Sequence, residues 1–577
     1  MAALAAMVAQ HLSLKDIAAC KLTSKVLNKA FNPYLWRRIS TAKPTDKDRL
    51  AHIFNRARAS GSLHRNRQYI ETLDLEIFAA EYLCALLNIS SVDDVVSMPS
   101  APAQEPTGTA SHPGFASLKA LSITIGALND IYSSWNVHDK AIAAEPLITL
   151  LETATNITRL TLYPEVLGNT KFIATLDSGL PHLETFILRR ARGLSALYFP
   201  VSCVLPILQP LFSKPKLTTL KLDFIMSYKR TLHSALVTKA MKDLAKNPKV
   251  KSAITSMVFP TGEYDLPSTF VNPIMKSCLP QLQILNVPFI GDQAYSKFAD
   301  IVRDHCPNQG VVRLIEACKN LRVFYGSSSS LGGDGGGIAR ALHKHAATLE
   351  TLFLEDTLVS SDVVGLLETM KALRTLVVSH RGTLNVKGAI SVRWAPRHLQ
   401  RLELTMEVKE STLGLVKSQK LDLDPEFNPG LPSGKLEDED LGYVAMRKFF
   451  KKLGELTELQ DLYIKHSKHS EWNLDKDWTL GVGLGFLGGL IKLRKLRLDY
   501  GLQHIGQAEV EFMHKHWPNL QEVVFYGEKN HVDKYMKLWT WLKARRPYLR
   551  YTYHTYIQPR EEYNPFDQFL YCNLEGY

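Results

Sequence analysis

A short hydrophobic motif recurs along most of the chain and limits what the chain can fold into. The motif has the form L-x-x-L-x-L, with other apolar residues allowed at the leucine positions. The 577-residue chain holds fourteen copies, which begin at residues 70, 118, 157, 183, 217, 254, 282, 321, 349, 373, 399, 459, 493 and 520. The alternation in the second half of the motif is the period of a β-strand with one buried face.

The stretches between the motifs have helical patterns. Clear examples are residues 337–348, GIARALHKHAAT, and residues 507–519, QAEVEFMHKHWPN. One strand and its returning helix cannot bury their apolar faces alone, whereas stacked units share one continuous core. We therefore predict an α/β fold, an irregular solenoid with parallel strands on the concave face and helices on the convex face. An ordinary α/β domain with a parallel sheet is the alternative.

The repeats resemble the leucine-rich repeat family over roughly residues 70–530. They are degenerate, because the Asn or Cys that follows the third leucine in the family is mostly missing and insertions lengthen several intervals. The predicted segments are 43–89 (a linker helix and the first repeat), 90–117 (a flexible Pro/Ser/Ala-rich insertion), 118–530 (degenerate repeats, with an insertion at 417–440) and 531–577 (an aromatic-rich C-terminal cap).

Residues 1–42 have a helical pattern of their own. Ser13 can cap a helix that carries apolar residues such as Ile17 and Leu27. We expect Asn32-Pro33 to end this helix, because the residue before a proline avoids the helical conformation. We expect Tyr34-Leu35-Trp36 to start a short helical turn that folds back. The result is a helical hairpin that is only marginally stable without docking to its neighbour.

This segment resembles an F-box. The resemblance rests on Leu12-Ser13, Asp16-Ile17, Cys20, Ser24-Lys25, Pro33, Leu35-Trp36-Arg37 and Ile39. An F-box followed by leucine-rich repeats is a known family architecture, and it implies docking on the adaptor subunit of a cullin-RING ligase. The residues implied as adaptor-binding are Leu12, Leu14, Ile17, Leu22, Pro33, Leu35 and Trp36. The alternative for Trp36 is a structural wedge between the helical module and the first repeat.

Composition and cysteine usage indicate where the protein works. The net charge of +12 is modest for this length, and the seven cysteines form no C-x-x-C pair. This usage predicts free thiols in a reducing compartment. No uncharged apolar run approaches the roughly 20 residues that span a bilayer. We expect an intracellular protein, cytoplasmic or nuclear, without a membrane partner.

Three motifs that suggest chemistry lack the rest of their pattern. The glycines of GVGLGFLG at 481–488 follow no apolar strand, and the glycine-rich stretch at 327–337 lacks the Lys-Ser/Thr of a P-loop. The two His-Lys-His triplets, at 343–345 and 514–516, have no carboxylate at metal-ligand spacing. We therefore expect no enzymatic activity, no catalytic residues, no cofactor and no metal site.

Positions three, five and seven of each motif should face the concave surface. In the C-terminal repeats these positions combine both charge signs with aromatic side chains, which favours protein recognition over a phosphate track. The candidate target-binding residues are Arg401, Glu403, Asp461, Tyr463, Lys465, Lys495, Arg497, Asp499, Glu522 and Tyr526. Basic clusters at 55–67 and 543–550 form no continuous stripe, so we do not expect nucleic acid to be the main partner.

Together these patterns predict the substrate-recognition subunit of an SCF-type (cullin-RING) ubiquitin ligase. The partners implied are the adaptor subunit and an unknown target protein bound on the repeat surface. A repeat scaffold without a ligase role is the first alternative, and a nucleic-acid-binding repeat protein is the second.

Overall fold

The computed structural model describes residues 5, 8–9, 17, 24–40, 66–76, 115–124, 137–163, 169–189, 198–223, 225–227, 253–259, 261–262, 281–287, 309–327, 336–355, 360–379, 383–407, 438–466, 479–481, 483–499, 505–527 and 532–555. The chain divides into two compact units, Met1–Asn320 and Leu321–Tyr577, which we call unit 1 and unit 2. Each unit has its own run of parallel strands.

Every copy of the motif forms a strand that begins at the third residue of the copy. In unit 1 these strands are β2 (Thr72–Glu76), β3 (Ala120–Thr124), β4 (Arg159–Leu162), β5 (Thr185–Arg189), β7 (Thr219–Asp223), β9 (Ser256–Val258) and β11 (Ile284–Val287). In unit 2 they are β12 (Val323–Ser327), β13 (Thr351–Glu355), β14 (Thr375–Ser379), β16 (Arg401–Glu407), β17 (Asp461–His466), β18 (Lys495–Asp499) and β19 (Glu522–Gly527). The α/β solenoid predicted from the repeats is confirmed.

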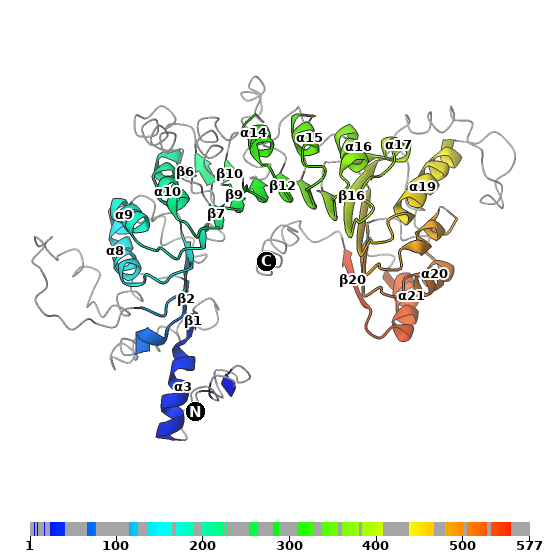
Figure 1. The fold of residues 1–577 in the computed structure, drawn as a ribbon. Coiled ribbons are helices and arrows are strands. Elements are labelled where there is room, and N and C mark those ends of the chain that lie inside the picture. Colours follow the sequence, from blue (N-terminus) through cyan, green and yellow to red (C-terminus); the bar gives the residue numbers. More distant parts are fainter. Residues whose placement is uncertain are drawn as a thin grey trace, which may run out of the picture. The chain divides into compact units, whose positions relative to one another are not determined.

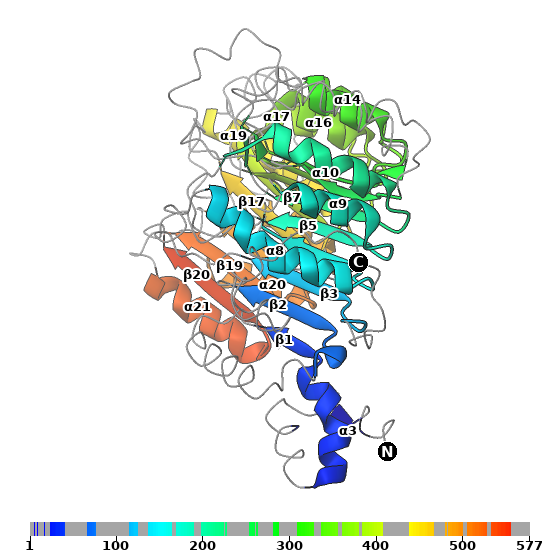
Figure 2. The same ribbon diagram turned by 90° about the vertical axis from the view of Figure 1, so that its left-hand side faces the viewer.

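In unit 1 the parallel strands follow the order β1–β2–β3–β4–β5–β7–β9–β11, where β1 is Arg38–Ser40. Helices α8 (Val137–Thr153), α9 (Thr170–Ser178) and α10 (Val201–Ser213) lie along one face of this sheet (Figure 2). Unit 1 also contains α14 (Gln309–Ala317) and a small parallel sheet of β6 (Tyr198–Pro200), β8 (Ile225–Ser227) and β10 (Thr261–Gly262).

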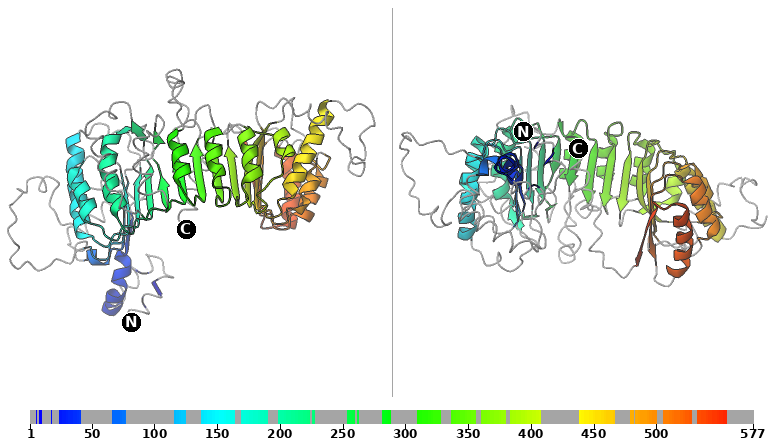
Figure 3. Two further views of the ribbon diagram at one scale, coloured as in Figure 1. Left: turned by 45° about the horizontal axis from the view of Figure 1, so that its top comes forward. Right: turned by 90° about the horizontal axis from the view of Figure 1, so that it is seen from below.

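In unit 2 the order is β12–β13–β14–β16–β17–β18–β19–β20, again parallel, and β15 (Thr383–Asn385) pairs with the end of β16. The helices are α15 (Gly336–His343), α16 (Ser360–Thr369), α17 (Val386–Ser391), α19 (Asp438–Gly454), the 3-10 helix η10 (Leu484–Gly489), α20 (Gln507–His516) and α21 (Val532–Arg545). They lie on one face of the sheet (Figure 1), and the strands of this unit run side by side (Figure 3). The opposite face is called the strand-lined face below.

The leucines at motif positions one and four are fully buried in both units. Leu217 and Leu220 of unit 1 and Leu373 and Leu376 of unit 2 all have 0% exposure. Burying one such side chain contributes about 1.5–3 kcal/mol. The repeated leucines therefore hold strands and helices together in the same way throughout.

One repeat strand, β20, is not preceded by a copy of the motif. Strand β20 (Arg550–Thr555) pairs with β19, so the sheet continues into the segment expected to be a cap. Leu549 is buried like the first leucine of the motif, and Tyr551 aligns with the buried Val523, which is the fourth residue of the preceding copy. One residue separates Leu549 from Tyr551, where the motif has two, so this copy is one residue shorter. A six-residue motif cannot match this shortened form.

The prediction that Asn32-Pro33 ends the N-terminal helix is wrong. Helix α3 runs from Lys25 to Trp36 with Pro33 inside it, and it begins at Ser24, whose side chain accepts a hydrogen bond from the Leu27 amide. The proline removes one backbone hydrogen bond. Packing compensates, because Phe31 forms a small core with residues on both sides of Pro33 in the sequence of α3.

Candidate protein-recognition face

The strand register places the predicted target-binding residues in adjacent rows on β16 to β19. Arg401, Asp461, Lys495 and Glu522 align in one row, which is position three of the motif. Glu403, Tyr463 and Arg497 align in the next row, at position five. Lys465 aligns with Thr405, and Asp499 aligns with Tyr526. The side chains of Asp499 and Tyr526 lie outside what the structure describes.

Glu403 is the centre of a charged cluster on this face. Its side chain is 1% exposed and lies between two cations. Arg401 Nη2 is 3.4 Å from Oε2, and Lys465 Nζ is 3.5 Å from Oε1. Oε1 has no hydrogen bond within the described part of the chain. Since an ionised carboxylate is costly to bury without compensation, the two cations hold it in place.

Asp461, on the neighbouring strand, belongs to the same cluster. Its Oδ2 is 3.6 Å from Arg401 Nε. Burial raises the pKa of the Asp461 carboxyl and Glu403 adds to this effect, while Arg497 and Arg401 act in the opposite direction. The charges on this part of the face are thus partly desolvated, which makes them sensitive to what covers them.

The ring of Tyr463 lies against two cations of this face. Lys465 Nζ lies 4.6 Å from the centre of its ring, and the Arg497 guanidinium carbon lies 5.8 Å from it. Such cation–π contacts fix the orientation of long side chains. In the neighbouring row, at position three, Lys495 Nζ forms an ion pair with Glu522 at 3.0 Å.

An apolar cluster on the same face was missed from the sequence. Tyr325, Phe353 and Val377 pack together, with the two rings stacked at 4.7 Å. The guanidinium carbon of Arg401 lies 5.6 Å from the Phe353 ring centre, so the apolar and charged clusters are adjacent. Phe353 and Val377 align in register with Glu403 through position five, and reading position five of the earlier repeats as well finds this cluster.

The N-terminal module brings together some of the residues implied by the F-box resemblance. Ala5, Ile17 and Phe31 form its buried centre. Leu27, Ala30, Tyr34 and Leu35 pack around this centre. Leu12, Leu14 and Leu22 lie outside the described residues. Pro33 and Trp36 lie on α3, and Val26, near the start of this helix, is 61% exposed.

Trp36 is at the junction between this module and the first sheet. It ends α3, and its Nε1 is buried without a hydrogen bond among the described residues. The junction is held by Asn32 Nδ2, which donates to Asn66 Oδ1 at 2.6 Å, and by an ion pair of Arg37 with Glu71 at 2.9 Å. Strand β1 follows at once and pairs with β2.

The described residues contain no group of three or more potential metal ligands. None of their helices is long and apolar enough to cross a bilayer. Cys318 is a free thiol, and burial raises its pKa to about 12, which suppresses the reactive thiolate. In the glycine-rich stretch 481–488, Gly483 precedes η10 and has a φ of 130°, a conformation that favours glycine. Glycine at this position therefore allows the tight turn into η10.

Comparisons with known proteins add a structural likeness only. No family model matches the sequence, and no curated protein matches it. The chain is similar to a chain of the crystal structure of the Rad7 and Elc1 complex in yeast, at 13% identity and a TM-score of 0.29, over 74% of this chain and 90% of that one. It is also similar to a chain of the TLR13–ssRNA13 complex, at 14% identity and a TM-score of 0.27, over 71% of this chain and 53% of that one. The fold assignment rests on the strands and register of the chain itself.

Proposed function

We propose that this chain is the substrate-recognition subunit of an SCF-type (cullin-RING) ubiquitin ligase. The N-terminal module docks on the adaptor subunit inside the cell, and the strand-lined face of unit 2 holds a target protein. The chain itself carries out no covalent step. It acts by proximity, since it holds a target lysine near ubiquitin chemistry that is performed elsewhere.

One observation carries this proposal. The F-box-like sequence Pro33-Tyr34-Leu35-Trp36-Arg37 ends a helix that leads directly into the first strand of a repeat sheet. The module and the sheet are therefore joined by a short, braced connection. Such a connection suits a receptor that must hold its target at a defined distance from the adaptor.

The nature of the face supports a protein target. It places an aromatic and aliphatic cluster, Tyr325, Phe353 and Val377, beside fixed charges of both signs. Aromatic anchors and arginines are enriched at the centres of protein interfaces. Glu403 and Asp461 on this face disfavour a polyanionic partner there.

Capture of purified adaptor subunit by the full chain tests the proposal. We expect the wild type to capture it and the double variant Leu35→Ala/Trp36→Ala to lose most of the capture. Because both side chains are partly buried, Val26→Asp on the exposed side of α3 provides a second test of docking. Tyr548→Ala, in unit 2 and 93% exposed, is the control and should bind as wild type does.

The outcomes separate the alternatives. No capture by the wild type contradicts the ligase role and favours a scaffold. Capture that survives Leu35→Ala/Trp36→Ala in a folded protein assigns these two side chains to the junction alone. Circular dichroism of each variant establishes that the protein is folded.

A further inference from the structure

The second residue of each motif lies just before its strand, so these residues form a continuous row across the N-terminal ends of the strands in unit 2. Six backbone hydrogen bonds of 2.7–2.8 Å connect successive members, each amide donating to the carbonyl of the preceding strand's residue. The row consists of Arg322, Glu350, Arg374, Gln400, Gln460, Arg494 and Gln521. At about 4.8 Å per strand it extends for about 29 Å. We call it the arginine edge.

The charge of the arginine edge is almost entirely positive. Its one carboxylate, Glu350, is neutralised by Arg322 at 2.9 Å. Arg374 and Arg494 are exposed. Among the described residues, no acidic side chain forms an ion pair with Arg374 or Arg494. The exposed Lys371 lies in the turn just before this edge and adds to its charge.

The same motif position in unit 1 has a different chemistry. Three of its residues there are threonines, and each hydroxyl donates to the carbonyl of the preceding strand's residue. Thr158 bonds to Lys119 at 3.2 Å, Thr218 to Glu184 at 3.2 Å, and Thr255 to Thr218 at 3.4 Å. These hydroxyls are satisfied within the edge, whereas Arg374 and Arg494 of unit 2 are exposed. Forming the sheet edge therefore does not require arginine.

An exposed aromatic residue stands at one end of the arginine edge. Tyr548, in the turn that precedes β20, the strand next to β19, is 93% exposed, which is costly for so large a ring without a partner. Arg545, at the end of α21, is exposed nearby in the sequence and stacks on Trp541 at 3.6 Å. Cations interspersed with aromatic side chains bind single-stranded nucleic acid through phosphate contacts and base stacking.

We infer that the arginine edge of unit 2 binds the backbone of a single-stranded nucleic acid without sequence preference. Each arginine can donate two parallel hydrogen bonds to the oxygens of one phosphate, and the glutamines between the arginines donate hydrogen bonds to phosphate or sugar. Tyr548 stacks on a base at the end of the track. An evenly spaced row of donors matches a regularly charged chain better than the scattered carboxylates of an acidic protein surface. This surface is separate from the one proposed to hold a protein target.

Fluorescence anisotropy of a labelled oligothymidine of about 20 nucleotides with the full chain tests this inference. We expect binding at about 50 mM salt that weakens steeply toward about 200 mM. Arg374→Gln/Arg494→Gln keeps long polar side chains but removes two charges. It should weaken binding about 10-fold or more and reduce the slope of log affinity against log salt by about 1.4. Tyr548→Ala should weaken binding about 5- to 100-fold.

The matched control removes two exposed charges elsewhere. Lys25→Gln/Lys29→Gln on α3 should stay within about twofold of wild type, because neither side chain belongs to the arginine edge. Three results overturn the inference. They are no binding by the wild type at low salt, an equal loss in the control, and displacement of the oligonucleotide by a polyglutamate peptide at equal charge with Tyr548→Ala unchanged.

Discussion

The strand-lined faces of the two units differ although the cores beneath them are alike. In unit 1, position five carries no aromatic side chain; its residues are Asp74, Ser122, Thr161, Ile187, Lys221, Val258 and Asn286. In unit 2 the same position carries three aromatic rings; its residues are Tyr325, Phe353, Val377, Glu403, Tyr463, Arg497 and Val524. The leucines specify the solenoid, and the residues between them decide what each unit can bind.

The shared core is the part of this comparison with the largest expected effects. Leu220→Ala in unit 1 and Leu376→Ala in unit 2 remove matched side chains that are both fully buried. Each should lower the free energy of unfolding of its unit by about 2–5 kcal/mol, through lost burial and the cavity that remains. Denaturant unfolding of the full chain measures both. A large loss in one unit with almost none in the other would contradict equivalent cores.

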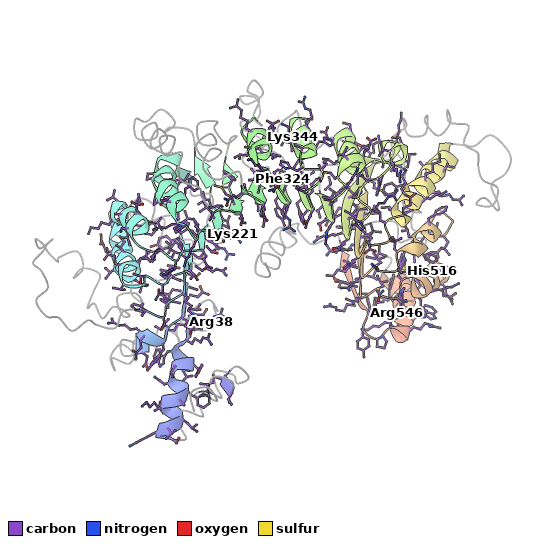
Figure 4. All side chains as sticks on the ribbon, viewed as in Figure 1. Arg38, Lys221, Phe324, Lys344, His516 and Arg546 are labelled. Carbon is purple, nitrogen blue, oxygen red and sulfur yellow. The ribbon has the colours of Figure 1, made fainter. Side chains whose placement is uncertain are left out.

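A second shared feature is a cation, buried in unit 1 and half-buried in unit 2, that binds carbonyls at the end of a neighbouring helix. In unit 1, Lys214 Nζ donates to the Asp177 carbonyl at 2.8 Å and to that of Gly179, at the end of α9. In unit 2, Arg546 donates to the Trp517 carbonyl at 2.5 Å, at the end of α20 (Figure 4, where Arg546 and His516 are labelled). These contacts satisfy carbonyls that a helix leaves unpaired.

Lys214→Met and Arg546→Met keep most of the side-chain volume and remove these hydrogen bonds. Each should cost about 1–3 kcal/mol, the usual range for hydrogen bonds to charged groups. Thermal melting of both variants provides the measurement, with Lys25→Met on the exposed surface of α3 as the control. A cost no greater than that of the control would show that these cations do not stabilise the helix ends.

The faces should respond differently to loss of a polar group. Glu403→Gln removes the carboxylate between Arg401 and Lys465, while Arg401 keeps its contact with Asp461; the variant should cost about 1–2 kcal/mol. Thr161→Val is the matched substitution at position five of unit 1 and should cost less than about 1 kcal/mol. Chemical denaturation distinguishes the two. Equal costs would mean that the charged cluster of unit 2 depends on Glu403 no more than the face of unit 1 depends on the Thr161 hydroxyl.

Asp461 gives the smallest effect and a defined pH dependence. Burial raises its pKa in the folded protein above the unfolded value. Protonation therefore favours folding, and this contribution is present at low pH and lost as the pH rises through the folded pKa. At pH 7, Asp461→Asn should melt no lower than wild type, and any advantage should shrink as the pH falls. A clearly lower melting temperature at pH 7 would mean that the ion pair with Arg401 outweighs burial.

Much of the fold was predictable because the motif combines two signals. Alternation marks the strand, and the first leucine marks the turn before it, so each of the fourteen predicted copies coincides with a strand. Two local features were not predictable from these rules. Strand β20 uses a motif one residue shorter, and α3 continues through Pro33 because packing around Phe31 outweighs the local preference of proline.

The candidate face was partly predictable. Position counting located the charged residues of β16 to β19 and the register aligns them, although their role in target binding stays a prediction. The apolar cluster at Phe353 was missed because aromatic residues within a strand are usually assigned to the core. The arginine edge was missed because net charge averages over the whole chain, and its members are about 24 to 60 residues apart in sequence.

Hydrogen exchange of the full chain with purified adaptor subunit tests the central claim most directly. The proposed docking predicts slower exchange of the amides of α3, Lys25–Trp36, with little change in the strands of unit 2. That result would localise the adaptor to the N-terminal module and leave the strand-lined face open for a target. Unchanged exchange in α3 at saturating adaptor, or protection confined to unit 2, would contradict the ligase role.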